Sequence, residues 1–207
     1  MSRTLHSLFP TRVWAAPLQR GGARVLNRQL LRECLQLRID DAAGRAWSQR
    51  NYLGGFTSYG SVSRMHTVSP TFAALARLID RHVARFAKTL QFDLLDRRLE
   101  MTDCWVNIMP QGVVHSLHLH PLSTISGTYY VQTPAGAPGL KFEDPRLDRY
   151  MAAPPRLPEA QADNRSWVML PAKAGSLLLF ESWLRHEVMP NPITRERISI
   201  SFNYSWF

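Results

Sequence analysis

The chain has 207 residues, of which 45% are hydrophobic, which is enough for one domain with a buried core but short for two. No run approaches the roughly 18 consecutive apolar residues of a membrane-spanning helix, and the opening MSRTLHSLFP lacks the pattern of a secretory signal, so we expect a cytoplasmic protein with no membrane partner. The formal charge is +9, but only three of the 25 basic residues are lysine and the arginines are scattered without forming a basic run, so we do not expect nucleic-acid binding.

Helical patterns dominate the first hundred residues. Between residues 20 and 40 the apolar positions recur broadly at helical spacing, and Gly44 follows as a stop signal. A stronger helix is predicted over residues 69–90, where a serine N-cap and a proline in the first turn precede an apolar stripe able to cover a sheet. Residues 52–66, rich in Gly, Ser and Tyr, predict irregular structure between the two helices.

The second half of the chain consists of short strands punctuated by Gly and Pro. The eight segments are DCWVNIM, VVHSLHLH, ISGTYYVQ, GLKFED, WVMLPA, SLLLFES, RHEVMP and ERISISFNYSW. No helix-length segment separates them, which argues against a βαβ fold. We therefore predict a single domain, mainly β with flanking helices: a jelly-roll core over residues 101–207, with a helical support region (residues 1–100) packed on its major sheet. Residues 144–166, irregular and containing four prolines, are expected to form a lid over the barrel mouth.

Three histidines follow a pattern typical of a metal site. His118 and His120 stand one residue apart in a predicted strand, so both imidazoles point from the same face of a sheet, and His186 arrives from a separate strand. Imidazole is a good ligand for first-row transition metals, so these three rings are candidate metal ligands. His115 faces the opposite way on a regular strand, and we do not expect it to be a ligand.

The last predicted strand has one apolar and one polar face. The polar face carries Arg197, Ser199, Ser201, Asn203 and Ser205, and it requires a wet or ligand-filled cavity. Arg197 and Ser199 point to the same side, where an arginine fork with a hydroxyl suits a carboxylate. The alternative for Arg197 is a surface ion pair with Glu196 or Glu187.

Several of these segments resemble the bacterial Fe(II)/2-oxoglutarate oxygenases, a group within the double-stranded β-helix dioxygenases. The matching pieces, in the family's order, are LFPTRVW, HLHPLSTISGTYYV, FEDPR, AGSLLLFESWLRHEVMPN and RISISFN. In that superfamily a His-x-Asp/Glu pair and a distal histidine hold the iron, and an Arg-x-Ser holds the far carboxylate of 2-oxoglutarate. The resemblance implies His118 and His186 as iron ligands and Arg197 and Ser199 as cosubstrate-binding residues.

The chain departs from the family pattern at His120, which stands where the superfamily has an acid. The site then consists of three histidines, which is chemically reasonable because neutral imidazoles suit Fe(II) and 2-oxoglutarate brings two negative charges. Asp144 or Glu181 is the alternative third ligand, with His120 supporting it from behind.

Two further polar residues are candidates for binding the cosubstrate. Tyr129 and Tyr130 face opposite ways in a strand, and Tyr130 shares the more polar face, so we expect its hydroxyl to donate to the cosubstrate carboxylate; core packing of its ring is the alternative. Asn107, in an otherwise apolar strand, is a weaker candidate of the same kind.

The resemblance implies an Fe(II)- and 2-oxoglutarate-dependent dioxygenase that hydroxylates a substrate with release of succinate and CO2. No separate catalytic residue is needed, because the metal and cosubstrate supply the chemistry.

A cupin-like metalloenzyme with the same three histidines is the alternative, but it would not need Arg197 and Ser199. A metal- or sugar-binding jelly roll without activity is another alternative. The substrate is expected to be a small molecule or a peptide, mildly favoured to be anionic by the positive charge, and a homodimer through the N-terminal helices is compatible with the sequence.

Overall fold

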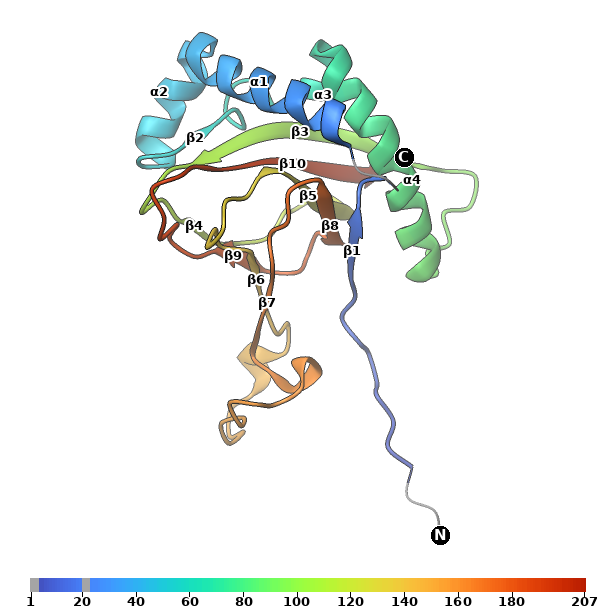
Figure 1. Cartoon of the computed structure of the whole chain (residues 1–207). Helices are drawn as coiled ribbons and strands as arrows, with labels where there is room; N and C mark the ends of the chain where they lie inside the picture. The colour runs from blue at the N-terminus through green and yellow to red at the C-terminus, as the bar shows by residue number, and fades with distance from the viewer. Residues whose placement is uncertain (1–3, 20–22) are drawn as a thin grey trace.

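Two antiparallel sheets lie face to face in the computed structural model, which describes residues 4–19 and 23–207 (Figure 1). The six-stranded sheet has the order β1 (Val13–Pro17), β8 (Ser176–Glu181), β5 (Ile125–Gln132), β10 (Arg197–Trp206), β3 (Leu99–Met109) and β2 (Phe56–Thr57). The four-stranded sheet has the order β4 (His115–His118), β9 (His186–Val188), β6 (Leu140–Glu143) and β7 (Trp167–Leu170). This is the predicted class, mainly β with flanking helices, and its two sheets follow the jelly-roll plan.

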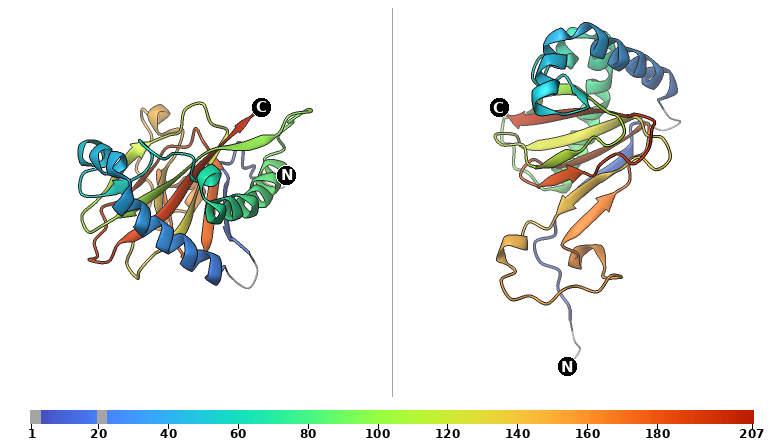
Figure 2. Two further views of the ribbon diagram at one scale, coloured as in Figure 1. Left: turned by 90° about the horizontal axis from the view of Figure 1, so that it is seen from above. Right: turned by 90° about the vertical axis from the view of Figure 1, so that its left-hand side faces the viewer.

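The described residues of the N-terminal half form four helices: α1 (Arg24–Asp40), α2 (Ala42–Asn51), α3 (Met65–Val68) and α4 (Pro70–Thr89). Helices α1 and α4 cover the outer face of the six-stranded sheet, as predicted (Figure 2). The start of α4 is also as predicted, because the Ser69 hydroxyl accepts hydrogen bonds from the first backbone N–H groups of the helix. No described helix combines the length and apolar character that a membrane crossing requires.

The first helix ends earlier than Gly44 suggests. Residue 20, the expected start, lies outside the described residues, and α1 ends at Asp40. Asp41 then serves as the N-cap of α2, where its carboxylate accepts a hydrogen bond from the Gly44 N–H at 2.7 Å. Gly44 therefore lies inside a second helix, and the glycine that resembled a stop is part of a new helix start.

Two hydrophobic cores follow from the layered arrangement. One lies between the helices and the six-stranded sheet and takes the apolar face of β10, including Ile198, Ile200 and Phe202. The other lies between the two sheets and includes Tyr130, Phe142 and Phe180. The polar face of β10 therefore points between the sheets, into the interior where the predicted site residues lie.

Strand pairing places three of those residues side by side. Ser199 of β10 lies opposite Asn107 of β3 on one side and opposite Tyr130 of β5 on the other. Directly opposed residues in antiparallel strands have neighbouring side chains on the same face of the sheet. The register thus forms one patch from three segments far apart in the sequence.

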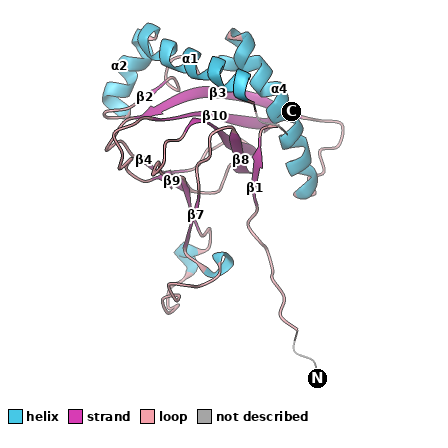
Figure 3. Ribbon diagram, viewed as in Figure 1, coloured by secondary structure: helices cyan, strands magenta, loops and turns pink. Residues whose placement is uncertain are grey.

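Residues 144–166 project away from the two sheets as a long excursion between β6 and β7 (Figures 1 and 3). The segment contains two short 3-10 helices, Leu147–Arg149 and Ala162–Asn164, and is mostly exposed. Its base is held by Asp144, whose carboxylate accepts hydrogen bonds from Arg146 and Tyr150. None of residues 145–166 lines the two cavities described below, so the structure gives no support to a lid.

Candidate metal centre

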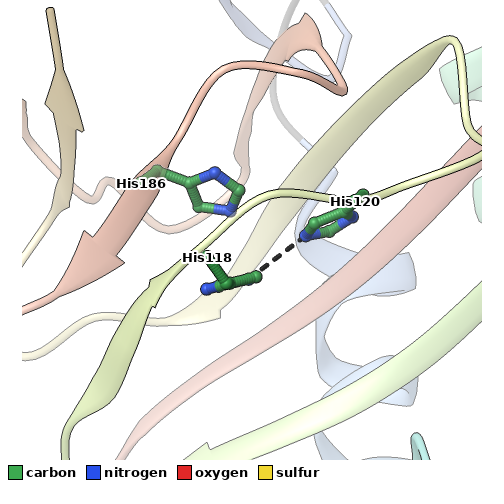
Figure 4. Close-up of side chains that lie close together, drawn as sticks. All are labelled: His118, His120 and His186. Carbon is green, nitrogen blue, oxygen red and sulfur yellow. Dashed lines mark hydrogen bonds between the residues drawn. The ribbon is translucent and has the colours of Figure 1, made fainter. Parts of the chain in front are cut away.

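Three imidazoles converge between the sheets (Figure 4). His118 ends β4, His120 follows just beyond the strand, and His186 begins β9, where it is paired with His118. One ring nitrogen from each of the three lies within 4.8 Å of the others. The structure thus brings the three histidines together as expected, close enough for a single ion to contact all of them.

Hydrogen bonds at Nδ1 fix the orientation of each histidine ring. Nδ1 of His118 lies 2.7 Å from the Ser116 carbonyl oxygen, and Nδ1 of His186 lies 2.9 Å from that of Leu184. A carbonyl oxygen can only accept, so Nδ1 carries the proton in both rings and Nε2 keeps a free lone pair.

A polar network behind His120 orients its ring in the same way, with the proton on Nδ1. Its Nδ1 lies 2.6 Å from Oδ1 of Asn203, whose amide nitrogen is directed toward Asp103 at 3.5 Å. The Ser126 hydroxyl donates to the same Asn203 oxygen at 2.8 Å. Because Asp103 can only accept, the Asn203 oxygen faces His120, and the His120 proton is on Nδ1.

The free nitrogens face each other. Nε2 of His118 and Nε2 of His120 are 3.2 Å apart (Figure 4). Burial lowers the pKa of both rings, that of His120 to about 4, and it lowers the pKa of His186 to about 2. Neutral imidazoles with opposed lone pairs repel unless a cation lies between them, so the donor set fits a divalent transition metal.

Neither alternative carboxylate joins this cluster. Among the described residues, the histidines form the group, without Asp144 or Glu181. The Asp144 carboxylate is bound instead by Arg146, with Nη2 to Oδ2 at 2.9 Å. The geometry therefore favours His120 over a carboxylate at the third position.

His115 does not face away from the site. The β4–β9 register shifts between His115 and His118, and the two rings stack with centroids 4.8 Å apart. The expectation of opposite faces rested on a regular strand and is wrong here, because the irregularity turns both side chains to one side. Burial lowers the pKa of His115 to about 3, so it adds a neutral ring to the cavity wall.

Arg197 is a buried cation at the far end of the same cavity. The residue is only 2% exposed. Its guanidinium donates from Nε to the Pro138 carbonyl at 3.0 Å and from Nη1 to the Ser199 hydroxyl at 3.1 Å. Within the described parts of the chain it has no salt bridge. The alternative of a surface ion pair is excluded, since Glu196 pairs with Arg38 and Glu187 pairs with Lys141.

Unsatisfied polar atoms surround this guanidinium. The Tyr130 hydroxyl and Oδ1 of Asn107 are buried without a hydrogen-bond partner, and the Arg197 guanidinium carbon lies 5.2 Å from the Tyr130 ring centroid. The Tyr52 hydroxyl is a third buried polar group without a hydrogen-bond partner, and Tyr52 was not predicted as a site residue from the sequence. Buried polar groups without partners are rare in proteins, and a cluster of them beside an unpaired cation is typical of a ligand-binding site.

Two cavities meet at the histidines. A narrow one, about 40 Å³, runs from the three rings to Arg197 and Ser199 and includes Asn107 in its wall. A larger one, about 530 Å³, begins at His118 and His120 and extends past Trp105 and Tyr59. The site therefore has one compartment between the metal-binding nitrogens and the buried cation, and a second compartment on the other side of the histidines.

The structure is a jelly-roll fold with three histidines that could hold a metal ion, and comparisons with known proteins specify it further. Residues 103–203 match the family model described as "Putative 2OG-Fe(II) oxygenase". No curated protein matches the chain in sequence.

Solved structures resemble the chain over most of its length. A Pseudomonas putida prolyl-4-hydroxylase has a TM-score of 0.59 and 18% identity, over 94% of this chain and 92% of that chain. The epimerase SnoN, in complex with Fe3+, alpha ketoglutarate and nogalamycin RO, has a TM-score of 0.63 and 15% identity, over 94% and 79%. HygX from Streptomyces hygroscopicus, with nickel, 2-oxoglutarate and hygromycin B bound, has a TM-score of 0.59 and 15% identity, over 94% and 83%.

These likenesses show that the fold is that of the 2-oxoglutarate oxygenases. Residues 103–203, which run from β3 to β10, match the 2OG-Fe(II) oxygenase family, and this match together with the shared fold identifies the protein as a 2-oxoglutarate-dependent oxidoreductase.

Proposed function

We propose that His118, His120 and His186 bind Fe(II) through Nε2, and that Arg197 and Ser199 bind the far carboxylate of 2-oxoglutarate. Tyr130 and Asn107 complete the cosubstrate site with their unsatisfied polar atoms. The observation that carries this proposal is the buried Arg197, which lines the narrow cavity with the three histidines and has no carboxylate partner among the described residues.

Charge balance supports a dicarboxylate in this cavity. A buried guanidinium without a counter-ion is costly, and an anionic ligand removes that cost. At the other end, three neutral imidazoles leave the charge of a divalent ion uncompensated, so a second carboxylate is favoured there as well. A ligand with a carboxylate at each end satisfies both sites at once.

With O2 as the oxidant, bound Fe(II) and 2-oxoglutarate would supply chemistry that places one oxygen atom in a substrate C–H bond and the other in succinate, with release of CO2. The chain's own residues position these groups. Ser116, Leu184 and Asn203 hold the three imidazoles in one tautomer, and Ser199 orients the guanidinium. Trp105 and Phe180, which are buried beside His120 and His186, keep water away from the reacting centre.

The proposal extends to the protein's surroundings. We propose a cytoplasmic enzyme whose substrate, a small molecule or a peptide, enters the larger cavity. Binding to nucleic acid or a membrane is not expected, and a homodimer through the N-terminal helices is compatible with this function. A cupin-like metalloenzyme with the same histidines is the second candidate, but it leaves the buried Arg197 without a purpose.

Anaerobic titration of the Fe(II)-loaded protein with 2-oxoglutarate tests the proposal. Chelation of the iron by the ketone and neighbouring carboxylate should produce a weak visible charge-transfer band. Arg197→Ala should retain iron and bind 2-oxoglutarate about 30-fold more weakly or worse, because loss of a buried charged partner costs about 2 kcal/mol or more. Arg98→Ala, which removes an arginine from an exposed ion pair with Glu100, is the control and should bind normally.

Ser199→Ala is a milder variant, useful if Arg197→Ala fails to fold, and it should also weaken 2-oxoglutarate binding without loss of iron. Iron bound without the band, and no effect of either substitution on 2-oxoglutarate affinity, would overturn the proposal in favour of the cupin-like alternative.

A further inference from the structure

The larger cavity has a wall without formal charge. It measures about 530 Å³, within the size range of small-molecule sites, and it shares Trp105, His115, His118 and His120 with the narrow cavity. Across the described ranges 4–19 and 23–207, no Arg, Lys, Asp or Glu lines it. In a chain with 25 basic and 16 acidic residues, this absence sets the cavity apart from the rest of the surface.

Aromatic rings form a continuous wall from the surface to the histidines. Trp47 and Tyr59 pack with centroids 6.1 Å apart, Tyr59 and Trp105 with centroids 5.1 Å apart, and Trp105 and His120 with centroids 5.8 Å apart. Tyr59 is half exposed and Trp105 is buried, so the series runs inward. A ligand in the cavity can contact aromatic surface along its whole length, from the rim to the histidine nitrogens.

The mouth of the cavity is apolar as well. Leu53 is 76% exposed, Val114 44% and Leu119 41%, and all three line the cavity. Large apolar side chains gathered at the rim of a pocket are typical of a binding surface rather than of an ordinary solvated face. They offer an entering apolar group more surface to bury.

Three polar side chains of the wall are committed to the protein itself, whereas the Tyr52 hydroxyl, also in the wall, has no partner. Asn51 donates to the Trp47 carbonyl, the Thr57 hydroxyl accepts from the Tyr59 N–H, and Asn203 accepts from His120. They offer little hydrogen-bonding capacity to a hydroxyl-rich ligand such as a sugar, since a polar ligand buried without partners loses the hydrogen bonds that it made with water.

We propose that this cavity takes an uncharged apolar or aromatic group of the substrate. This inference rests on the proposed function, because it assigns the larger cavity to the substrate of the same metal centre. It replaces the expectation of an anionic substrate from net charge, since the scattered arginines do not reach the cavity. A charged group would leave water and find no counter-charge in this wall.

A series of naphthalene derivatives tests the proposal by calorimetric titration of the protein. The probes are 2-naphthol, 2-naphthalenesulfonate and trimethyl(2-naphthyl)ammonium, which share one ring system and differ in charge. With Fe(II) and 2-oxoglutarate present under anaerobic conditions, 2-naphthol should bind at least about tenfold more tightly than either ion, because only the ions lose hydration without compensation. The uncharged amide of N-acetyl-3-(2-naphthyl)alanine, compared with 2-naphthol, distinguishes a peptide side chain from a free small molecule.

Two pairs of variants locate the binding. Tyr59→Ala should weaken 2-naphthol about two- to tenfold by removing one ring of the wall, whereas Trp206→Ala, an exposed tryptophan outside the cavity, should not. Leu53→Lys places a cation at the rim and should raise affinity for the sulfonate, whereas Ile39→Lys, on an exposed position of α1, should not. Both substituted rim residues are exposed, so folding should be retained.

Tighter binding of the sulfonate or the ammonium ion to the unaltered protein would overturn the proposal, as would 2-naphthol affinity that is insensitive to Tyr59→Ala. Failure of the proposed function has a different signature: 2-oxoglutarate would not bind, while the naphthalene series repeated without iron and cosubstrate would still report on the cavity. The two inferences can therefore fail separately.

Discussion

Oδ1 of Asn203 lies 2.6 Å from Nδ1 of His120, so an amide from β10 fixes the ring of a histidine that follows β4. The interaction is unlike those of the other two rings, whose Nδ1 atoms bind backbone carbonyl oxygens two residues earlier in the chain. His118 and His186 are thus oriented locally, whereas His120 depends on a side chain 83 residues away. Asn203 shares this nitrogen with the Ser126 hydroxyl at 3.0 Å, and a substitution at Asn203 alters the setting of one candidate ligand without touching the partners of the other two.

Replacement of Asn203 by Leu should weaken metal binding by about 10- to 100-fold, the usual effect of removing a partner that orients a ligating histidine. Asn203→Asp keeps an acceptor opposite Nδ1 and should retain metal affinity. Ni(II) titration by calorimetry measures both. Ser205→Ala, on the same face of β10 but outside both cavities, is the control and should leave affinity unchanged.

Equal Ni(II) affinity in the Leu and Asp variants would show that the amide does not orient the ligand. A thermal melt of each variant separates this result from misfolding, since the Asp variant tests the same buried position with a similar volume.

His120→Asp should keep iron, because a carboxylate can take the place of the third imidazole in a two-histidine, one-carboxylate set. His120→Ala should lose it, together with His118→Ala and His186→Ala. His115→Ala is the matched control, since this ring stacks on His118 but lies outside the group of converging nitrogens. Iron content after anaerobic loading and desalting decides the matter, and full iron retention in His120→Ala would refute a three-histidine site.

Asp144→Asn should leave iron binding intact and loosen the projecting segment. The buried carboxylate accepts hydrogen bonds from Arg146 and Tyr150, and although burial raises its pKa, these bonds outweigh burial and hold the pKa below the usual range. The amide cannot reproduce the ion pair, so limited proteolysis should cut residues 145–166 faster in the variant. Loss of iron would instead revive Asp144 as a ligand.

Without added metal, the protein should become less stable as the pH falls below about 6.5, the ordinary value for histidine. Burial lowers the pKa of His120 to about 4, of His115 to about 3 and of His186 to about 2, so between these values and 6.5 the unfolded chain binds protons that the folded chain does not. Each such ring contributes a slope of up to about 1.4 kcal/mol per pH unit. Urea unfolding at several pH values measures the slope, which His186→Phe should reduce; a midpoint that is constant from pH 7 to pH 5 would contradict the assignment.

Local patterns made much of the fold predictable. The serine and proline at the start of α4 and the alternation along β10 are read from neighbouring residues, and the structure agrees with both. The alternation also separated Tyr129 from Tyr130: the first packs under the helices and the second between the sheets. Where side-chain direction depends only on strand period, the sequence was sufficient.

Features that depend on long-range pairing were not predictable. The position of His115 follows from an irregular register with β9, and no residue near it marks the irregularity. Arg197 does not pair with its neighbour Glu196, because the Glu196 carboxylate pairs with Arg38. Those two residues are 158 positions apart in the chain, so no local pattern predicts the pair. A net charge of +9 likewise misled about the substrate cavity, because composition does not say where charges lie.

Tyr129 and Tyr130 provide a matched test of the cosubstrate site, because adjacent residues on opposite faces of β5 differ in how their hydroxyls are satisfied. The Tyr129 hydroxyl donates to Oδ1 of Asn27 at 2.8 Å. The Tyr130 hydroxyl is buried beside Arg197 without a partner. The first hydroxyl therefore stabilises the fold, and the second is the one that we propose to bind the cosubstrate.

Tyr130→Phe should leave the stability of the ligand-free protein unchanged or higher, since it removes an unsatisfied buried hydroxyl, yet weaken 2-oxoglutarate about tenfold by removing a donor to a carboxylate. Tyr129→Phe should do the reverse, with a loss of about 0.5–1.5 kcal/mol in the free energy of unfolding and normal 2-oxoglutarate affinity. Urea unfolding and anaerobic 2-oxoglutarate titration of both variants measure the two effects. If Tyr130→Phe instead lowers stability and leaves 2-oxoglutarate affinity unchanged, the Tyr130 ring only packs in the core between the sheets.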